Sequence, residues 1–329
     1  MNKMQHICVV GFNWSGSSAV VDLMKEFSGN WDPEDEFFIL TLPNGIMDLE
    51  NVLFERWDPH NVDIAIHDLL SFAMFINRNQ GKFSRGMSYD DHFHGQFMQA
   101  TKEFVEEITS YEFKGYWWIY NYKMPYSKWL YRKIKNKIIP KEYFETMYYS
   151  KPTREEFYKA VQNYMNKLVE AISIDQGCRN IILDQAVQPQ HPAKAFDYFD
   201  NAKVIVVDRD PRDIYCELVE LKKLIGRDIA ETHDTWKFIK WHKDYRENGR
   251  VNDERILYLQ FEDLIYSYDE AINKIVNFID DPEMSHTDVK KYFDPAVSKK
   301  NVGKYKNFKY QDEIKQIEDE LSEYLYVQR

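Results

Sequence analysis

Short apolar runs alternate along this chain with longer segments in which apolar residues recur every three or four positions. Consecutive apolar residues, often β-branched, are typical of a buried strand, and the wider spacing is typical of an amphipathic helix. The runs predict strands at about 6–11, 181–183, 204–207 and 256–260. The periodic segments predict helices at about 17–28, 48–56, 67–77, 91–110, 153–174, 191–199, 211–221, 229–247, 268–280 and 311–325.

The order of these elements predicts how they assemble. Parallel strands need a long crossover between them, and a helix is the usual one, so strands that alternate with helices imply a parallel sheet. Helices then cover both faces of that sheet. We therefore expect an α/β fold in three layers, with one domain over residues 1–329 and helical insertions at about 41–175.

Local sequence patterns predict further elements within the insertion and just before it. Residues 31–40 predict a loop that enters a short apolar strand, and Asp48 is expected to cap the helix that follows the turn at 43–45. The helix at 67–77 is apolar enough to be buried, residues 78–90 predict a loop, and residues 116–120 predict an aromatic strand.

A basic segment at 123–141 holds seven lysines and arginines and no acid, with Tyr126, Trp129 and Tyr131 interleaved. Two interpretations stay open. The segment is either a solvated helix face with a buried aromatic side, or a surface for an anionic or glycan acceptor or for a membrane.

Composition narrows the class of protein. The net charge of −11 argues against non-specific nucleic-acid binding, which needs a basic surface. Three cysteines without close pairs argue against a disulfide framework or a zinc site and favour a reducing, cytoplasmic location. The polar N-terminus predicts no signal peptide, and no apolar run approaches the ~18 residues of a membrane-spanning helix.

Candidate chemistry begins where the first predicted strand ends, at Gly11. The spacing from Gly11 to Gly16 fits the first half of a P-loop, G-x-x-x-x-G, whose backbone N–H groups point at an anion near a helix N-terminus. Ser17 stands where the P-loop lysine would follow. The loop therefore predicts a phosphate site, but not a site for a metal-bound triphosphate.

Two further segments bring basic residues to the same predicted edge of the sheet. The strand at 204–207 leads into Arg209 and Arg212, and arginine suits bidentate phosphate contacts. The segment 298–308 combines lysines, a glycine and aromatic residues. Since the carboxyl ends of parallel strands carry the ligands of such folds, these segments predict a phosphate clamp.

In this arrangement the sequence resembles the sulfotransferases that use 3′-phosphoadenosine 5′-phosphosulfate (PAPS). Residues 14–18 resemble the 5′-phosphosulfate loop of that family, Arg209-x-Pro211-x-Asp213 resembles its 3′-phosphate motif, and 299–308 is similar to its third, glycine-containing motif. The resemblance implies a P-loop-like sulfotransferase fold, PAPS as co-substrate and no metal. It implies donor-binding roles for Trp14, Ser15, Gly16, Ser17, Ser18, Arg209, Lys299, Lys300, Gly303, Lys304 and Tyr305.

Two positions depart from the family pattern. Trp14 stands where the family has a loop lysine, and we expect Lys300, Lys304 or Arg78 to replace its charge. Glu217 stands where the family has a serine beside the 3′-phosphate, and we expect this carboxylate to turn away or the contact to be lost.

Transfer of a sulfonate to a hydroxyl requires a base in hydrogen-bond reach of that hydroxyl. Glu36 is the first candidate, because it lies twenty positions after Gly16 and before Phe37-Phe38, as the catalytic glutamate does in the glycan 3-O-sulfotransferases that the sequence resembles. Asp184, at the end of a predicted strand, is the second, and His67 is the third.

The function predicted from these features is transfer of a sulfonate from PAPS to a hydroxyl of a glycan or glycoconjugate. Peripheral membrane contact through 123–141 is part of the expectation, and nucleic acid is not a partner. Two alternatives remain open: an inactive nucleotide-binding protein with the same fold, because of Trp14 and Glu217, and a P-loop kinase of small molecules, which lacks its lysine here.

Overall fold

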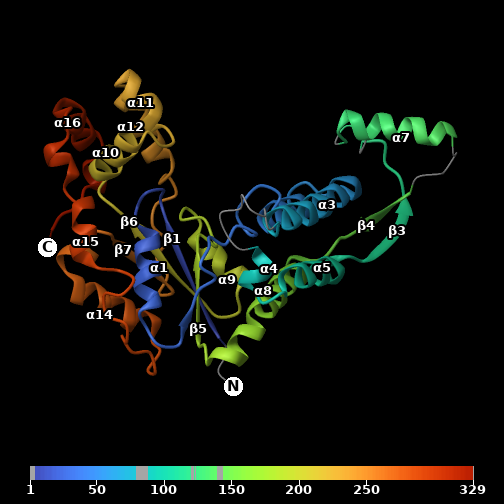
Figure 1. Cartoon of the computed structure of the whole chain (residues 1–329), viewed down its shortest axis with the longest axis horizontal. Coiled ribbons are helices and arrows are strands. Elements are labelled where there is room, and N and C mark those ends of the chain that lie inside the picture. Colours follow the sequence, from blue (N-terminus) through green and yellow to red (C-terminus); the bar gives the residue numbers. More distant parts are fainter. Residues whose placement is uncertain (1–3, 79–87, 120–121, 123, 139–143, 329) are drawn as a thin grey trace.

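Five parallel strands form the central sheet of the computed structural model, in the order β2-β5-β1-β6-β7 (Figure 1). The structure describes residues 4–78, 88–119, 122, 124–138 and 144–328. The strands are β1 (Gln5–Gly11), β2 (Asn30–Trp31), β5 (Asn180–Asp184), β6 (Ala202–Asp208) and β7 (Ile256–Gln260). Every pairing between them is parallel, so the predicted parallel sheet is confirmed.

Helices cover both faces of this sheet. Alternate residues of β1 face opposite sides, so that Ile7 and Val9 join one buried cluster and Cys8 and Val10 join another. The first cluster lies beneath α1 (Ser17–Lys25) and α14 (Tyr268–Ile279), and the second beneath the helices of the insertion. Because apolar residues fill both faces, the strands are continuous apolar runs and the predicted three layers are confirmed.

The remaining helices surround this framework. In the insertion they are α2 (Ile46–Phe54), α3 (Pro59–Ile76), α4 (Tyr89–His92), α5 (Phe97–Ile108), α7 (Tyr126–Ile138) and α8 (Arg154–Gln176). After β5 they are α9 (Ala195–Tyr198), α10 (Pro211–Leu221), α11 (Gly226–Thr232), α12 (Thr235–Asp244), α13 (Asp263–Tyr266), α15 (Pro295–Ser298) and α16 (Gln311–Glu320).

Part of the insertion forms an arm that projects from the rest of the molecule (Figure 1). Its stem is an antiparallel ribbon of β3 (Tyr111–Gly115) and β4 (Glu145–Tyr149), and α7 lies at the far end of that ribbon. We call the described residues from 111 to 149 the α7 arm. The arm and the helices at its base lie within the predicted insertion at 41–175. That the insertion and the sheet form one domain stays a prediction.

The predicted strand within 31–40 is wrong. Two residues, Asn30 and Trp31, pair with β5, and the apolar residues that follow form turns. The carbonyl groups of Ile39 and Leu40 accept hydrogen bonds from the first N–H groups of α2, at 3.0 and 3.1 Å. Their backbone therefore caps a helix instead of extending the sheet, while their side chains are still buried.

Other element boundaries also differ from prediction. Asp48 does not cap α2, which starts two residues earlier, and the helix predicted from residue 67 starts at Pro59 after an Asp58 cap. The buried character of that helix is partial, because Met74 and Phe75 are exposed.

Two predicted helices are each divided. The segment 91–110 becomes α4 and α5, with His94 at φ 51° between them, and 229–247 becomes α11 and α12, with His233 at φ 56°. A left-handed residue ends an α-helix, and apolar spacing does not reveal it. The aromatic strand lies at Tyr111–Gly115 rather than at 116–120; Tyr120 and most of the predicted loop at 78–90 lie outside the described residues.

Candidate active site

A cleft of about 620 Å³ opens at the carboxyl edge of the sheet, where β1, β5 and β6 end. Six of the predicted site residues line it: Trp14, Gly16, Ser17, Ser18, Glu36 and Arg209. A larger groove of about 1070 Å³ runs along α8, but charges of both signs line it and it contains no predicted site residue. The carboxyl edge is where ligands bind in open α/β sheets, so we take the smaller cleft as the candidate site.

The loop between β1 and α1 forms one wall of the cleft. Trp14 and Gly16 both have left-handed backbone conformations, at φ 61° and 93°, which turn the chain sharply into the helix. A Cβ atom on Gly16 would lie 2.4 Å from the Phe261 ring, so the close approach of loop and ring requires glycine. Ser17 and Ser18, the first residues of α1, line the cleft, and the first turn of a helix is a general anion-binding position.

Arg209 connects all three segments that resemble the family motifs. Its guanidinium group donates to the carbonyl of Trp14 at 3.0 Å, to the carbonyl of Asn301 at 2.5 Å, and to the carboxylate of Glu217 at 2.7 Å. The side chain is 4% exposed and lies over the Phe261 ring. The predicted convergence of the loop, the β6–α10 junction and the C-terminal segment therefore occurs around one buried arginine.

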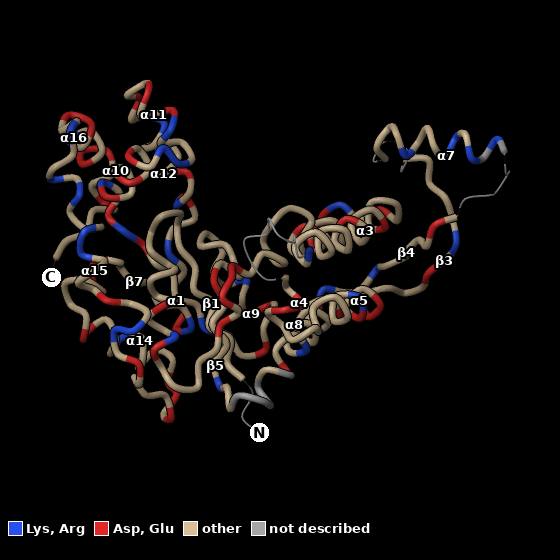
Figure 2. Tube along the Cα trace, viewed as in Figure 1, with Lys and Arg blue, Asp and Glu red and all other residues tan. Residues whose placement is uncertain are grey.

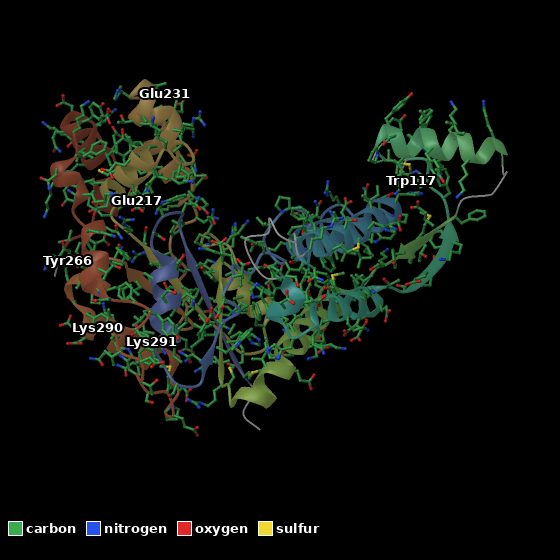
Figure 3. The ribbon with its side chains drawn as sticks, in the orientation of Figure 1. Trp117, Glu217, Glu231, Tyr266, Lys290 and Lys291 are labelled. Atoms are coloured by element: carbon green, nitrogen blue, oxygen red, sulfur yellow. The ribbon has the colours of Figure 1, made fainter. Side chains whose placement is uncertain are left out.

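The expectation that Glu217 turns away is wrong. Glu217 lies on α10 (Figure 3), and its carboxylate forms an ion pair with Arg209. Arg209 lies just before α10 and Glu217 lies on it, and a buried guanidinium with no ligand needs a counter-charge. The pair uses a guanidinium nitrogen that the family resemblance assigns to a phosphate.

The C-terminal segment packs on α10 but contributes little to the cleft wall. The N–H groups of Gly303 and Tyr305 donate to Asp213, at 2.7 and 3.3 Å, and the guanidinium of Arg212 lies 3.9 Å from the centre of the Tyr305 ring. Lys304 pairs with Glu220 at 2.7 Å. Lys299 and Lys300 are exposed, and Ser298 and Asn301 are the members of this segment that line the cleft.

The loop has no lysine, and the three expected substitutes for its charge lie outside the cleft. Among the described residues that line the cleft, Arg209 is the one with a cationic side chain. The proposed replacements Arg78, Lys300 and Lys304 do not line it. Ser15 is buried behind the loop, where its hydroxyl has no partner among the described residues.

Glu36 is the base candidate that faces the cleft. Tyr89 holds its backbone, since the phenol donates to the Glu36 carbonyl at 2.5 Å and accepts from the Phe38 N–H at 2.8 Å. The N–H of Phe37 donates to the carbonyl of Asp184 at 2.8 Å. Partial burial and the charge of Asp35 raise the pKa of Glu36, which makes it a stronger base once ionised.

Asp184 and His67 lie elsewhere. Asp184 lines an adjoining acidic hollow that it shares with Glu36 and Lys25, and burial together with the charge of Glu36 raises its pKa to about 7. His67 lies on α3, where its ring is 3.0 Å from the carbonyl of Thr146 on the arm. It does not line the cleft, so its position gives no support to a role as the base.

Sequence reasoning missed several residues of the cleft. Gln185 donates to the Ser17 hydroxyl at 2.9 Å, and Phe261 supports both Gly16 and Arg209. Gln185 and Phe261 lie just after predicted strands. The expectation that ligands bind at the carboxyl ends of parallel strands could therefore have found both. Tyr245 and Tyr89 reach the site from helices, and no local pattern marks them. The other lining residues outside the prediction include Asn13, Thr41, Gln188 and Pro189.

Comparisons with known proteins identify the family of the chain. A family model described as "Sulfotransferase family" matches residues 6–284. Among solved structures, the sulfotransferase STF9 of Mycobacterium avium is 14% identical, with 98% of this chain and 76% of that chain covered and a TM-score of 0.39. The sulfotransferase domain of a Synechococcus olefin synthase is 13% identical, with 100% and 96% covered and a TM-score of 0.34.

A sulfotransferase domain from the curacin biosynthetic pathway is 15% identical, with 98% of both chains covered and a TM-score of 0.38. No curated protein matches the chain.

Proposed function

This chain belongs to the sulfotransferase family, and from that membership we propose that it transfers a sulfonate group from PAPS to a hydroxyl of a glycan or glycoconjugate. One observation carries the proposal: three distant segments meet at buried Arg209, beside an ionisable Glu36 in the same cleft. A site for a doubly phosphorylated nucleotide needs such a convergence of anion-binding groups next to a base.

The donor fits one feature of the cleft wall. The Nε atom of Arg209 is a buried polar group without a partner among the described residues, and such a group is costly unless a ligand or water satisfies it. The N–H groups at the start of α1 and the hydroxyls of Ser17 and Ser18 would hold the 5′-phosphosulfate, and Arg209 would hold the 3′-phosphate. Glu217 must then release Arg209.

Glu36 performs the proton transfer in this proposal. Its ionised carboxylate accepts the proton of the acceptor hydroxyl, whose oxygen forms the new bond to sulfur as the bond from sulfur to the 5′-phosphate oxygen breaks. The donor supplies the sulfonate, and 3′-phosphoadenosine 5′-phosphate leaves. The N-terminus of α1 stabilises the charge that develops on the leaving 5′-phosphate.

The composition of the cleft supports a glycan acceptor. Asn13, Gln185 and Gln188 offer amide groups, which both donate and accept hydrogen bonds, as sugar hydroxyls require. Tyr245 and Phe38 offer rings against which the apolar face of a sugar packs. We also propose a cytoplasmic location, which the free thiols of Cys8, Cys178 and Cys216 support.

Binding and turnover of the donor test the proposal separately. We expect 3′-phosphoadenosine 5′-phosphate to raise the melting temperature of the full chain, and PAPS to yield sulfated product with a glycan mixture as acceptor. The variant Arg209→Gln should lose the thermal shift. A protein that shows no shift at millimolar nucleotide contradicts donor binding. Binding without transfer to any acceptor would favour the inactive alternative.

A further inference from the structure

Helix α7 leaves apolar side chains uncovered. Tyr126, Leu130, Tyr131 and Ile134 are 73%, 39%, 65% and 52% exposed. Tyr126, Leu130 and Ile134 follow one another at intervals of four residues, so they form a stripe along one side of the helix. Figure 1 shows this helix on the projecting arm, away from the central sheet. A stripe of this kind normally faces a core, whereas these side chains are exposed.

The rest of the helix surface is basic. Lys128, Arg132, Lys133, Lys135 and Lys137 lie on α7, which contains no acidic residue, and Figure 2 shows blue without red along it. Lys123 and Lys141, the ends of the predicted basic segment, lie outside the described residues. The whole chain carries a net charge of −11, so this positive charge is concentrated in one place. Of the interleaved aromatic residues, Tyr126 and Tyr131 are exposed and Trp129 is half-buried, so the interpretation with a buried aromatic side fails for the two tyrosines.

Aromatic residues surround the same end of the arm. Trp118 and Tyr122 are 56% and 78% exposed where the ribbon leads into α7. Trp117 (Figure 3) anchors this end instead, because its ring contacts that of His60 at the start of α3, with the centroids 4.3 Å apart. Exposed tryptophan and tyrosine rings are typical of surfaces that meet a boundary between water and an apolar phase.

We propose that the α7 arm docks the protein on an anionic lipid bilayer. The apolar stripe enters the boundary between headgroups and acyl chains, while the lysines of α7 contact acidic headgroups on either side of it. A basic amphipathic helix with interfacial aromatics fits this partner in both charge and polarity.

The geometry favours a helix that lies on the bilayer. With 13 residues at ~1.5 Å each, α7 is about 20 Å long, which is shorter than the ~30 Å hydrocarbon core. Among the described residues, no helix is long and apolar enough to cross a membrane. Pairing of two α7 helices from separate copies would bring ten like charges together, which opposes a dimer through this surface.

Vesicle sedimentation of the full chain tests the proposal. We expect binding to vesicles of phosphatidylcholine mixed with phosphatidylglycerol, little binding to phosphatidylcholine alone, and weaker binding as sodium chloride rises. The variant K128E/K135E should bind at least ~30-fold more weakly, at about fivefold for each basic residue removed. L130S/I134S should also lose binding, because it removes apolar area from the stripe.

Matched controls separate the arm from general charge. K102E/K159E makes the same charge change at exposed positions of α5 and α8, and it should bind like the unaltered protein. Circular dichroism and melting temperature establish that each variant is folded. Equal binding to both kinds of vesicle, or unchanged binding of K128E/K135E, would overturn the proposal. The proposal would also be overturned if the protein does not bind vesicles but forms a dimer, and if L130S/I134S dissociates that dimer.

Discussion

Glu217 and the proposed 3′-phosphate compete for one guanidinium group. Arg209 is buried and already donates to two carbonyl oxygens and one carboxylate. A charge-assisted bond of this kind stabilises the empty site, because it neutralises a buried cation. The donor must replace it with an equivalent interaction, so the glutamate lowers affinity for the nucleotide without touching the reaction centre.

Replacement of Glu217 by serine, the residue of the family pattern, should strengthen binding of 3′-phosphoadenosine 5′-phosphate. We expect about a tenfold lower Kd, equivalent to ~1.4 kcal/mol, because the phosphate no longer displaces a carboxylate. Calorimetric titration measures the change. Glu220→Ser is the matched control on the same helix, since Glu220 pairs with Lys304 rather than Arg209. An unchanged or higher Kd for Glu217→Ser would contradict the competition.

Replacing Glu36 and Asp184 by their uncharged amides should have different effects on the rate of sulfonate transfer. Glu36→Gln removes the proposed base and should reduce kcat by a factor of about 10² to 10⁴, with the nucleotide Kd nearly unchanged. Asp184→Asn should retain most activity, because Asp184 lines the adjoining hollow. Steady-state sulfonate transfer distinguishes the two, and loss of activity in Asp184→Asn alone would assign the base to Asp184.

The pH dependence of stability reports on Asp184. Burial, and next the charge of Glu36, raise the pKa of this group to about 7 in the folded protein, whereas the unfolded value is near ~4. The folded state therefore loses stability as the pH rises from about 4 to 7, because the carboxyl must ionise beside Glu36. Asp184→Asn should melt higher than the unaltered protein at pH 8, by about 3 °C or more, and no higher at pH 4. Calorimetric melting curves at the two pH values provide the measurement.

At the scale of elements, Glu26 attaches a C-terminal segment to the end of α1. Its fully buried carboxylate accepts from the N–H groups of Lys290, Tyr292 and Phe293, at 2.8 to 2.9 Å, and pairs with His286 at 2.7 Å. Burial alone would raise the pKa of Glu26, but these hydrogen bonds outweigh it and lower the pKa. One side chain therefore positions the loop that leads to α15 and the Ser298 side of the cleft.

Glu26→Gln should lower the free energy of unfolding by about 3 kcal/mol at neutral pH, since an amide cannot satisfy several donors as a carboxylate does. The lowered pKa means that the unaltered protein loses this stabilisation as the pH falls below ~4.5, so the difference between the two proteins should shrink there. Urea unfolding at several pH values gives the comparison. The partly exposed pair of Asp22 with Lys25 on the same helix supplies the control, and Asp22→Asn should cost under ~1 kcal/mol. Equal losses in both variants would contradict the anchoring role.

The helix ends show which features of the elements the sequence predicts. The helices predicted at about 153–174 and 211–221 occur as α8 and α10, and Thr153 and Asp210 cap them through hydrogen bonds to residues three and two positions away. The break at His233 and the turn at Ile39–Leu40 depend on distant packing, which local pattern does not contain. For the same reason, the sequence placed the phosphate-type loop and Arg209 correctly at the sheet edge but did not reveal the pairing with Glu217.

For the whole molecule, the sequence predicted the strands and layers of the fold better than it predicted the projecting arm. Buried parallel strands are continuous apolar runs, and these carry a strong local signal. The ribbon and α7 of the arm carry little signal of that kind, because exposed strands and a basic helix differ only slightly from ordinary surface segments. Their arrangement as a projecting arm is a tertiary feature, and it became visible only in the structure (Figure 1).

The central position of β1 has a consequence for synthesis on the ribosome. The strand is translated well before its partners, because Gln5 pairs with Asn180 and His6 with Ala202, so both neighbouring strands emerge long after it. During that interval the nascent chain exposes an apolar strand with two open edges, which is a risk for aggregation. The antiparallel ribbon of the arm closes between residues 111 and 149, so it can form while β1 still waits. Cotranslational folding of this protein should therefore begin at the periphery and reach the nucleotide site last.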